Sequence, residues 1–112
     1  MHELSLAMDV IDLVTVEAGK NHLGNVSEIQ IEVGFLSGVE ADAFEWALEL
    51  AAKGTILESA GIQIMRTTGT GRCDACNIEF EMKQILDTCP ECHGYPTEVK
   101  GGNEFRVVSI TG

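Results

Sequence analysis

All four cysteines of this 112-residue chain lie between positions 73 and 92, in two CxxC pairs. The first pair is Cys73-Asp-Ala-Cys76, and after twelve further residues the second is Cys89-Pro-Glu-Cys92. Two CxxC pairs at this separation can place four thiolates at the corners of a tetrahedron, which is the arrangement that zinc prefers. The spacing therefore predicts a structural zinc site made by Cys73, Cys76, Cys89 and Cys92. With all four positions filled by protein, such a site has no open position for hydrolysis.

Four cysteines in two CxxC pairs can serve purposes other than zinc binding. Two disulfides would need an oxidising compartment, and a redox-active CxxC or a rubredoxin-like iron site is also chemically possible. The start of the chain favours a reducing cytoplasm, because it lacks the basic region of a signal peptide and carries acids at Glu3, Asp9 and Asp12. The segment also lacks the aromatic packing expected around a redox iron. Zinc is therefore the favoured metal.

The segment that carries the cysteines, residues 70–101, has few large apolar side chains. Between the two pairs, Ile78, Phe80 and Met82 alternate with polar residues, which predicts a hairpin strand. Gly94 is expected to relieve the tight turn after the second pair. Since so small a module cannot fold by burial alone, metal binding must supply much of its folding free energy.

Outside this segment the chain has the pattern of a small α+β domain. Apolar residues recur every three or four positions over residues 4–18 and roughly 39–53, which predicts two helices. Ser37 and Glu40 fit a capping box at the start of the second helix, in which Ser37 accepts from a backbone N–H and Glu40 reaches back.

Residues 26–33, 62–68 and 104–110 read as strands, the first by clean alternation and the last by its β-branched side chains. Residues 104–110 would expose several apolar side chains unless they return to the sheet of the other two strands. We therefore predict an α+β fold: a two-layer sandwich of two helices on a three-stranded sheet, with an inserted four-cysteine, zinc-ribbon-like module. The predicted domains are 1–69 with 102–112, and the zinc-binding module 70–101.

Charge excludes several classes of partner. Eighteen acidic against seven basic residues give a net charge of −11, so the chain should repel nucleic acid and anionic membranes. No apolar run approaches the ~18 residues that a transmembrane helix needs. We also find no nucleophile with a matched base and no phosphate-binding glycine loop, so the sequence gives little support to an enzyme.

The first three residues, Met1-His2-Glu3, form a potential chelate. The amine of Met1, the amide nitrogen of His2 and the His2 imidazole can hold one metal through fused five- and six-membered rings, and Glu3 offers a further donor. Such nitrogen-rich surroundings suit Ni(II) or Cu(II). The plainer alternatives are that terminal residues serve no purpose, or that Glu3 only complements a helix N-terminus.

Together these features resemble the HypA/HybF family of nickel metallochaperones for [NiFe]-hydrogenase maturation. The resemblance covers essentially the whole chain: the start MHELSLA, the stretch around Glu32-Val33-Gly34 and Phe44, the pairs CDAC and CPEC, and the late segment GGNEFRVVSI. It implies that His2 is a nickel ligand supported by Glu3 and the Met1 amine, and that the four cysteines hold structural Zn(II). Family members can carry an acidic residue close to the nickel site, and Glu40 is the position that could match it, besides its expected capping role.

The resemblance also implies a function and partners. The chain would not be an enzyme but would carry Ni(II) as cargo, passing it with a partner GTPase to the [NiFe]-hydrogenase large subunit, with urease as a second destination. His22 and His93 are expected to be solvated. The alternative function is a zinc-ribbon protein-interaction module without a role in nickel transfer.

Overall fold

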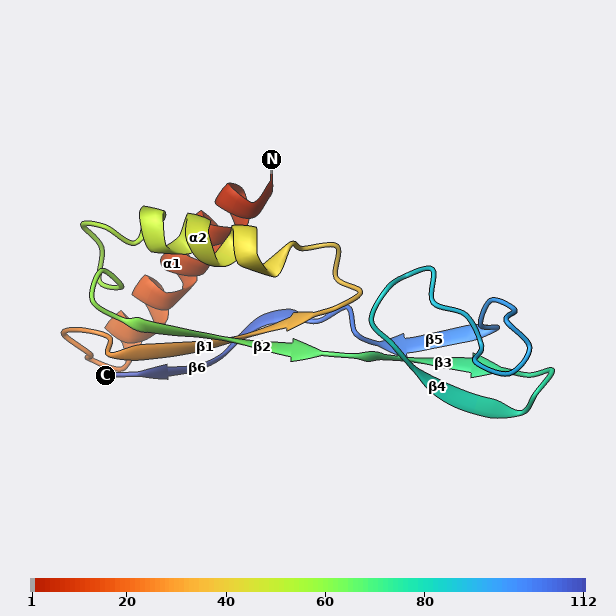
Figure 1. Ribbon diagram of the computed structural model, residues 1–112. Helices are drawn as coiled ribbons and strands as arrows, with labels where there is room; N and C mark the ends of the chain where they lie inside the picture. The colour runs from red at the N-terminus through yellow and green to blue at the C-terminus, as the bar shows by residue number, and fades with distance from the viewer. Residues whose placement is uncertain (1) are drawn as a thin grey trace. The chain divides into compact units, whose positions relative to one another are not determined.

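The computed structural model describes residues 2–112, which form an α+β fold (Figure 1). Its elements follow in the order α1 (His2–Lys20), β1 (Glu28–Gly34), α2 (Ala41–Ala51), β2 (Gly61–Thr67), β3 (Gly69–Cys73), β4 (Ile78–Met82), β5 (Glu98–Gly101) and β6 (Phe105–Thr111). The strands form two three-stranded sheets, ordered β2-β1-β6 and β4-β3-β5. The predicted class is confirmed: two helices accompany one three-stranded sheet, and a four-cysteine module is inserted before the last strand.

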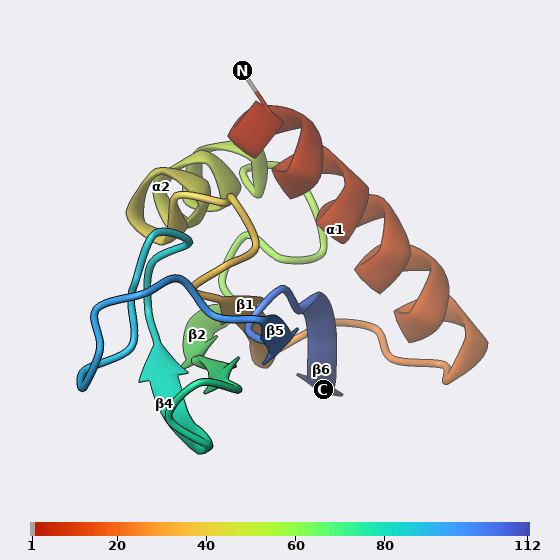
Figure 2. The ribbon, with the colours of Figure 1, turned by 90° about the vertical axis from the view of Figure 1, so that its right-hand side faces the viewer.

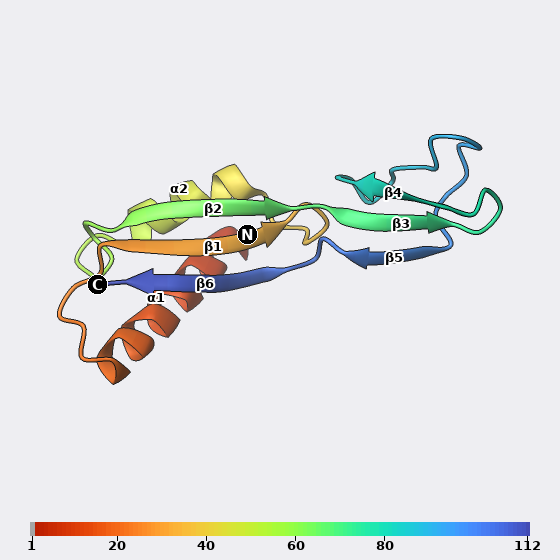
Figure 3. The same cartoon turned by 90° about the horizontal axis from the view of Figure 1, so that it is seen from below.

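Both helices lie on the same side of the sheet β2-β1-β6 (Figures 1 and 2). Seen from the other side, the three strands stand in front of the helices with β1 in the middle (Figure 3). Every second residue of β1 is fully buried, as its alternation predicts, because alternate side chains of a strand point to opposite faces. The core is completed by buried residues on one face of each helix: Ala7, Val10, Ile11, Val14 and Ala18 of α1, and Ala41, Phe44, Ala47 and Leu48 of α2.

The last strand returns to the first sheet, as its apolar composition predicts. The order β2-β1-β6 places β6 beside β1, although the whole second sheet lies between β2 and β6 in the sequence. At the end of this pairing the Ser27 N–H donates to the carbonyl of Thr111 at 2.8 Å. The four-cysteine module is therefore an insertion and not a tail.

The start of α2 differs from the prediction. Glu40 is itself the N-cap residue, and its carboxylate accepts from the backbone N–H of Asp42 at 3.0 Å. Ser37 accepts instead from the N–H of Val39 at 3.2 Å, so the predicted capping box is wrong. The reason is Gly38, whose φ of 81° lies in the left-handed region and ends any helical path from Ser37.

In the second sheet, β3 pairs antiparallel with both β4 and β5. Gly71 lies opposite Phe80 on one side and Val99 on the other. A Cβ on Gly71 would come within 2.9 Å of the Phe80 ring and the Met82 sulfur, so the absence of a side chain lets these two residues close over the strand.

The chain divides into two compact units. The first holds the residues up to Ile31, with 40–65 and 106–112, and the second holds 32–39 and 66–105. The domain boundaries drawn from the sequence stay a prediction, because a compact unit is not by itself an independently folding domain. Neither helix in residues 2–112 combines the length and the hydrophobicity of a membrane-spanning segment.

Candidate metal centre

The four cysteine sulfurs converge at one end of the second sheet. Their Sγ atoms all lie within 4.8 Å of one another, and those of Cys73 and Cys92 are 3.6 Å apart. A tetrahedral zinc site with Zn–S bonds of about 2.3 Å has sulfur–sulfur edges of about 3.8 Å. The arrangement therefore fits a four-thiolate zinc ion, held by Cys73 at the end of β3, Cys76 in the following turn, and Cys89 and Cys92 in the loop before β5.

Each CxxC pair is followed by a residue in the left-handed conformation. Asn77 directly after Cys76 has a φ of 54°, and His93 directly after Cys92 has a φ of 63°. The second turn is closed by two backbone hydrogen bonds, from the Cys89 N–H to the Gly94 carbonyl at 2.8 Å and from the His93 N–H to the Cys89 carbonyl at 2.9 Å. The expected role of Gly94 is thus wrong: its neighbour His93 supplies the positive φ that sharpens the turn.

Backbone N–H groups point at two of the sulfurs and set their acidity. The N–H of Cys92, helped by that of Glu91, lowers the pKa of the Cys89 thiol to about 7. The N–H of Cys76 also favours the Cys73 thiolate, but burial and the neighbouring thiols outweigh it, and the pKa of Cys73 is raised. The thiol of Cys92, together with burial, raises the pKa of Cys76 to about 12. Without metal the cluster thus favours a thiolate at Cys89. A divalent cation would stabilise the thiolate form of the other cysteines as well.

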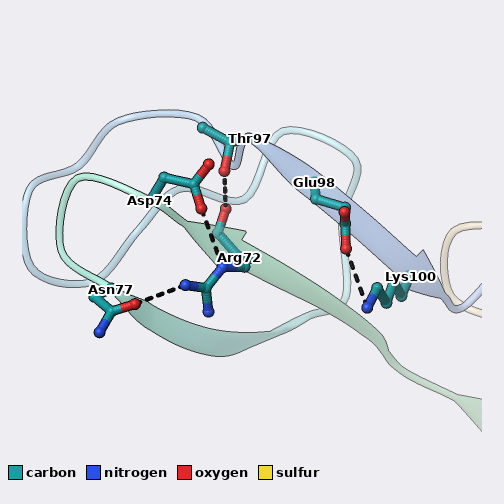
Figure 4. Close-up of polar contacts among 6 residues, drawn as sticks. All are labelled: Arg72, Asp74, Asn77, Thr97, Glu98 and Lys100. Carbon is teal, nitrogen blue, oxygen red and sulfur yellow. Dashed lines mark hydrogen bonds and ion pairs between the residues drawn. The ribbon is translucent and has the colours of Figure 1, made fainter.

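Arg72 organises the first CxxC turn (Figure 4). Its guanidinium donates to the carboxylate of Asp74 at 3.0 Å and to the side-chain oxygen of Asn77 at 2.6 Å. Its carbonyl accepts from both the backbone N–H and the hydroxyl of Thr97, at 2.8 and 2.9 Å. Arg72 therefore ties the residues on both sides of Cys76 to the strand that ends in Cys73. Arg72 was not among the residues predicted from the sequence, where the only available signal was an arginine directly beside a CxxC pair.

Burial supplies little stability to this module. Among residues 70–101, the buried apolar side chains are those of Met82 and of two of the cysteines, Cys73 and Cys89. Ile85, Leu86 and Tyr95 are each more than two-thirds exposed. Since each buried aliphatic side chain contributes only about 1.5–3 kcal/mol, Met82 alone cannot offset the ordering of about thirty residues. A metal ion held by the four thiolates would supply the folding free energy that burial does not.

The candidate nickel residues lie at the start of α1. His2 is the first residue of the helix, its side chain is 62% exposed, and its Nε2 lies 3.8 Å from the Glu3 carboxylate. The first backbone N–H groups of a helix have no partner within the helix, so the amide of His2 is not committed to the helical ladder. Met1, the third part of the predicted chelate, lies outside the described residues.

The other candidate metal ligands do not form a metal-binding group with His2 and Glu3 in the described residues. In residues 2–112, the four cysteines are the only group of three or more His, Cys, Asp or Glu side chains close enough to hold one ion. Glu40 is exposed and its carboxylate caps α2, and His22 and His93 are exposed as well. The structure thus brings the four cysteines together and leaves His2, Glu3 and Glu40 outside any such cluster.

Comparison with known proteins decides the family. A family model described as "Hydrogenase/urease nickel incorporation, metallochaperone, hypA" matches residues 1–112. The chain belongs to the HypA family. It is 37% identical to "Hydrogenase maturation factor HypA" of Albidiferax ferrireducens, over 98% of this chain and 97% of that protein. It is 40% identical to the protein of the same name from Parabacteroides distasonis, over 98% and 96% of the two chains.

Solved structures show the same fold as this HypA chain. The solution structure of the Ni metallochaperone HypA from Helicobacter pylori matches with a TM-score of 0.66 at 24% identity, covering 99% of this chain and 97% of that one. A second HypA solution structure matches with a TM-score of 0.65 at 25% identity, covering 99% and 95%. The family is thus one of nickel metallochaperones for hydrogenase and urease, and the predicted resemblance is confirmed.

Proposed function

We propose that this HypA chain is a nickel metallochaperone that binds Ni(II) through its first three residues. The donors would be the Met1 amine, the amide nitrogen and imidazole of His2, and the Glu3 carboxylate. The observation that carries this proposal is the position of His2 as an exposed first residue of α1, next to an acidic side chain. There the amide has no partner within the helix and the imidazole is open to solvent, so both can reach one ion.

A solvent-exposed binding site suits a protein that carries a metal ion to a partner. A metal that must be handed on is better held at a surface, where a partner can replace the ligands one at a time, than in an enclosed cage. We propose that Ni(II) is cargo in this sense and that the chain performs no catalytic step. It would deliver the ion, together with a maturation GTPase, to the [NiFe]-hydrogenase large subunit, with urease as a further destination. This transfer would take place in the reducing cytoplasm, where cysteine thiols stay free to bind metal.

The four cysteines have a separate role in this proposal. They would hold Zn(II) permanently. The bound ion would cross-link the module through its four tetrahedral ligands and would take no part in a reaction. The supporting observations are the sulfur–sulfur spacing and the small number of buried apolar side chains in residues 70–101. The module would then act as a rigid element for docking or sensing, without exchanging its metal for nickel.

Glu40 is a candidate for a weaker contribution to nickel binding. Its carboxylate is exposed, and one oxygen accepts from the Asp42 N–H. A carboxylate has two oxygens, so the other can serve as a donor while the cap is kept. Replacing Glu40 by Gln keeps the capping oxygen and removes the charge, so a loss of nickel affinity in Glu40→Gln would assign the residue to the site.

The test is calorimetric titration of zinc-loaded protein with Ni(II), comparing the native terminus with a variant that carries two extra residues before Met1. We expect tight binding of about one nickel per chain in the native form, loss of that binding in the extended form, and an unchanged zinc content of about one per chain. His2→Ala should behave like the extended variant, and His22→Ala is the matched control that should bind normally. Equal nickel binding by the native and extended forms would place nickel elsewhere, with the cysteines first. Absence of binding in both forms would favour the zinc-ribbon interaction module.

A further inference from the structure

A groove of about 630 Å³ runs through the first unit between α1 and β6. The C-terminal half of α1 lines it with Leu13, Glu17 and Asn21. The strand lines it with four consecutive residues, Val107–Ile110, and Leu23 and Gly112 complete the wall. Successive side chains of a strand point to opposite faces, so a groove that touches four in a row must follow the edge of the strand. We call it the β6 groove.

The edge of β6 that the β6 groove follows is not paired with another strand of residues 2–112. The order β2-β1-β6 pairs β6 with β1 on one side, and no other strand of residues 2–112 lies on its second side. Two views show the C-terminal turns of α1 projecting beyond this edge, so that the helix overhangs it (Figures 2 and 3). The overhanging helix would hold a segment against the strand while leaving the strand's backbone accessible.

The outer part of β6 has none of the usual protections against strand addition. Natural edge strands carry Lys, Pro, or inward charges that prevent pairing with another chain. Residues 107–111, Val-Val-Ser-Ile-Thr, contain no charge, no Pro and no Gly. A strand of this composition is a template for a further strand, because main-chain hydrogen bonds supply affinity and pockets beside the edge select side chains.

The chemistry of the walls defines the occupant. Leu13 and Val108 are each 47% exposed, so they offer apolar contact to alternate side chains of an extended segment. Glu17 gives the helical wall a carboxylate whose described ionic partner is Lys20, at 3.5 Å and in the last turn of the same helix. A second copy of this chain is disfavoured, because it would bring another net charge of −11 to the same surface.

We propose that the β6 groove binds an extended segment of a basic partner protein as a fourth strand of the sheet, with an aliphatic residue and a Lys or Arg two positions apart. These two side chains point to the same face of the segment, so the aliphatic one packs against Leu13 while the basic one pairs with Glu17, one turn further along α1. None of the residues involved belongs to the cysteine cluster or to the first three residues. The groove is therefore an interaction surface separate from both metal sites, and its test does not depend on nickel binding.

The test uses the zinc-loaded full chain, labelled with ¹⁵N, and an acetylated and amidated heptapeptide whose odd positions are valine, lysine, valine and lysine in turn and whose even positions are threonine, so that valine and lysine share one face. We expect amide shifts and slowed hydrogen exchange at Val107–Ile110, with smaller shifts from Leu13 to Asn21. An N-methylated peptide of the same sequence cannot donate main-chain hydrogen bonds and should bind at least about tenfold more weakly. A peptide with Glu in place of Lys should also bind more weakly, and added salt should reduce binding of the lysine peptide.

Two variants locate the site. Val108→Lys adds a charge to the free edge and should weaken binding of the lysine peptide by more than about tenfold. Glu17→Gln should weaken it by about two- to fivefold and reduce its salt dependence. Val16→Lys is the matched control, since Val16 is exposed on α1 but does not line the groove, and it should bind as the native chain does. Zinc content and circular dichroism establish that each variant is folded.

Three outcomes would overturn the proposal. Shifts that map away from β6 and α1 would show that the peptide binds another surface. Equal binding of the N-methylated peptide would show that no strand is added. Protection of the Val107–Ile110 amides that rises with protein concentration in the absence of peptide, together with a doubled mass, would show that a second copy occupies the groove.

Discussion

The carbonyl oxygen of Gly102 occupies the position that a Cβ on Gly34 would take, and the same carbonyl accepts a hydrogen bond from the Leu36 N–H at 2.7 Å. A Cβ on Gly102 would in turn come within 2.7 Å of the Gly69 backbone. Three glycines from distant parts of the sequence therefore meet where β1 ends, β3 begins and the chain turns toward β6. Their missing side chains allow three backbone segments to approach and hydrogen-bond.

Gly34→Ala is predicted to destabilise the protein strongly. The new methyl group would meet backbone atoms, which cannot rotate away as a side chain can, so we expect a loss of about 2–3 kcal/mol in the free energy of unfolding. Gly19→Ala is the control, because nothing lies within 4 Å of its Cβ position and the residue is helical. There we expect a gain of up to about 1 kcal/mol. Urea denaturation of the zinc-loaded proteins measures both, and equal effects of the two substitutions would contradict the packing argument.

The two aromatic residues of α2 should differ sharply in their contribution to stability. Phe44 is fully buried, whereas Trp46, two positions later, is 66% exposed. Phe44→Ala should cost about 3–5 kcal/mol by loss of buried surface and creation of a cavity. Trp46→Ala should change the free energy of unfolding by less than about 0.5 kcal/mol. Trp46 is the one tryptophan of the chain, so its fluorescence should resemble that of solvated indole. A blue-shifted emission would show that its ring is covered.

Much of this fold follows from local patterns in the sequence. The alternation within residues 26–33 identifies β1, and the apolar side chains of 104–110 require β6 to return to the sheet. The strand β5 could not be predicted, because all four residues Glu98–Gly101 are exposed and only the pairing with β3 makes them a strand. Likewise β3 contains two glycines, which disfavour a strand locally but are selected by the close approach of neighbouring side chains.

The metal centre shows the same division between local and tertiary information. The spacing of the four cysteines is sufficient to predict that their sulfurs meet. The support by Arg72, Asp74 and Asn77 depends on rotamers and on the left-handed backbone of Asn77, which no spacing rule specifies. The cap of α2 was misplaced for a related reason, since the conformation of Gly38 decides it.

Arg72→Lys is predicted to weaken the zinc site although it keeps the charge. Lysine lacks the planar fork that lets Arg72 donate to Asp74 and Asn77 together. These partners are partly exposed, so we expect a modest loss of about 0.5–1 kcal/mol in stability and up to about tenfold in zinc affinity. Lys100→Ala is the control, because its surface ion pair with Glu98, at 3.1 Å, does not touch the CxxC turn. Competition with a chromogenic chelator measures the affinities, and equal effects of the two variants would refute a specific role of Arg72.

Removal of zinc is predicted to unfold the module and to spare the helical layer. The buried apolar side chains of the helices and of β1 do not depend on metal, whereas residues 70–101 bury little besides Met82 and two cysteines. After treatment with a strong chelator we expect the amides of β3, β4 and β5 to lose protection from hydrogen exchange, while those of α1 and β1 keep it. Restoring zinc should restore the protection. Retained protection throughout β3–β5 in metal-free protein would mean that the module folds without its ion.

Proton release on zinc binding is predicted to depend on pH through Cys89. The backbone N–H of Cys92 holds the pKa of this thiol at about 7, below the ordinary value of 9.0. The donors lie in the same turn as Cys89, and backbone hydrogen bonds among residues 89–94 close this turn, so it can persist when β3–β5 unfold without zinc. A lowered pKa stabilises this metal-free turn at a pH above the ordinary value, and this contribution is lost as the pH falls through about 7. At pH 6 Cys89 still carries its proton and must release it to zinc, whereas at pH 8 it has mostly lost it.

The raised pKa values of Cys73 and Cys76 keep those thiols protonated at both pH values, so they release protons in either case. We therefore expect the number of protons released per zinc to fall by roughly one between pH 6 and pH 8. Calorimetric titration of metal-free protein in buffers of different ionisation enthalpy gives this number directly. The same release at both pH values would show that the backbone N–H groups at the second CxxC pair do not stabilise the Cys89 thiolate before the metal arrives.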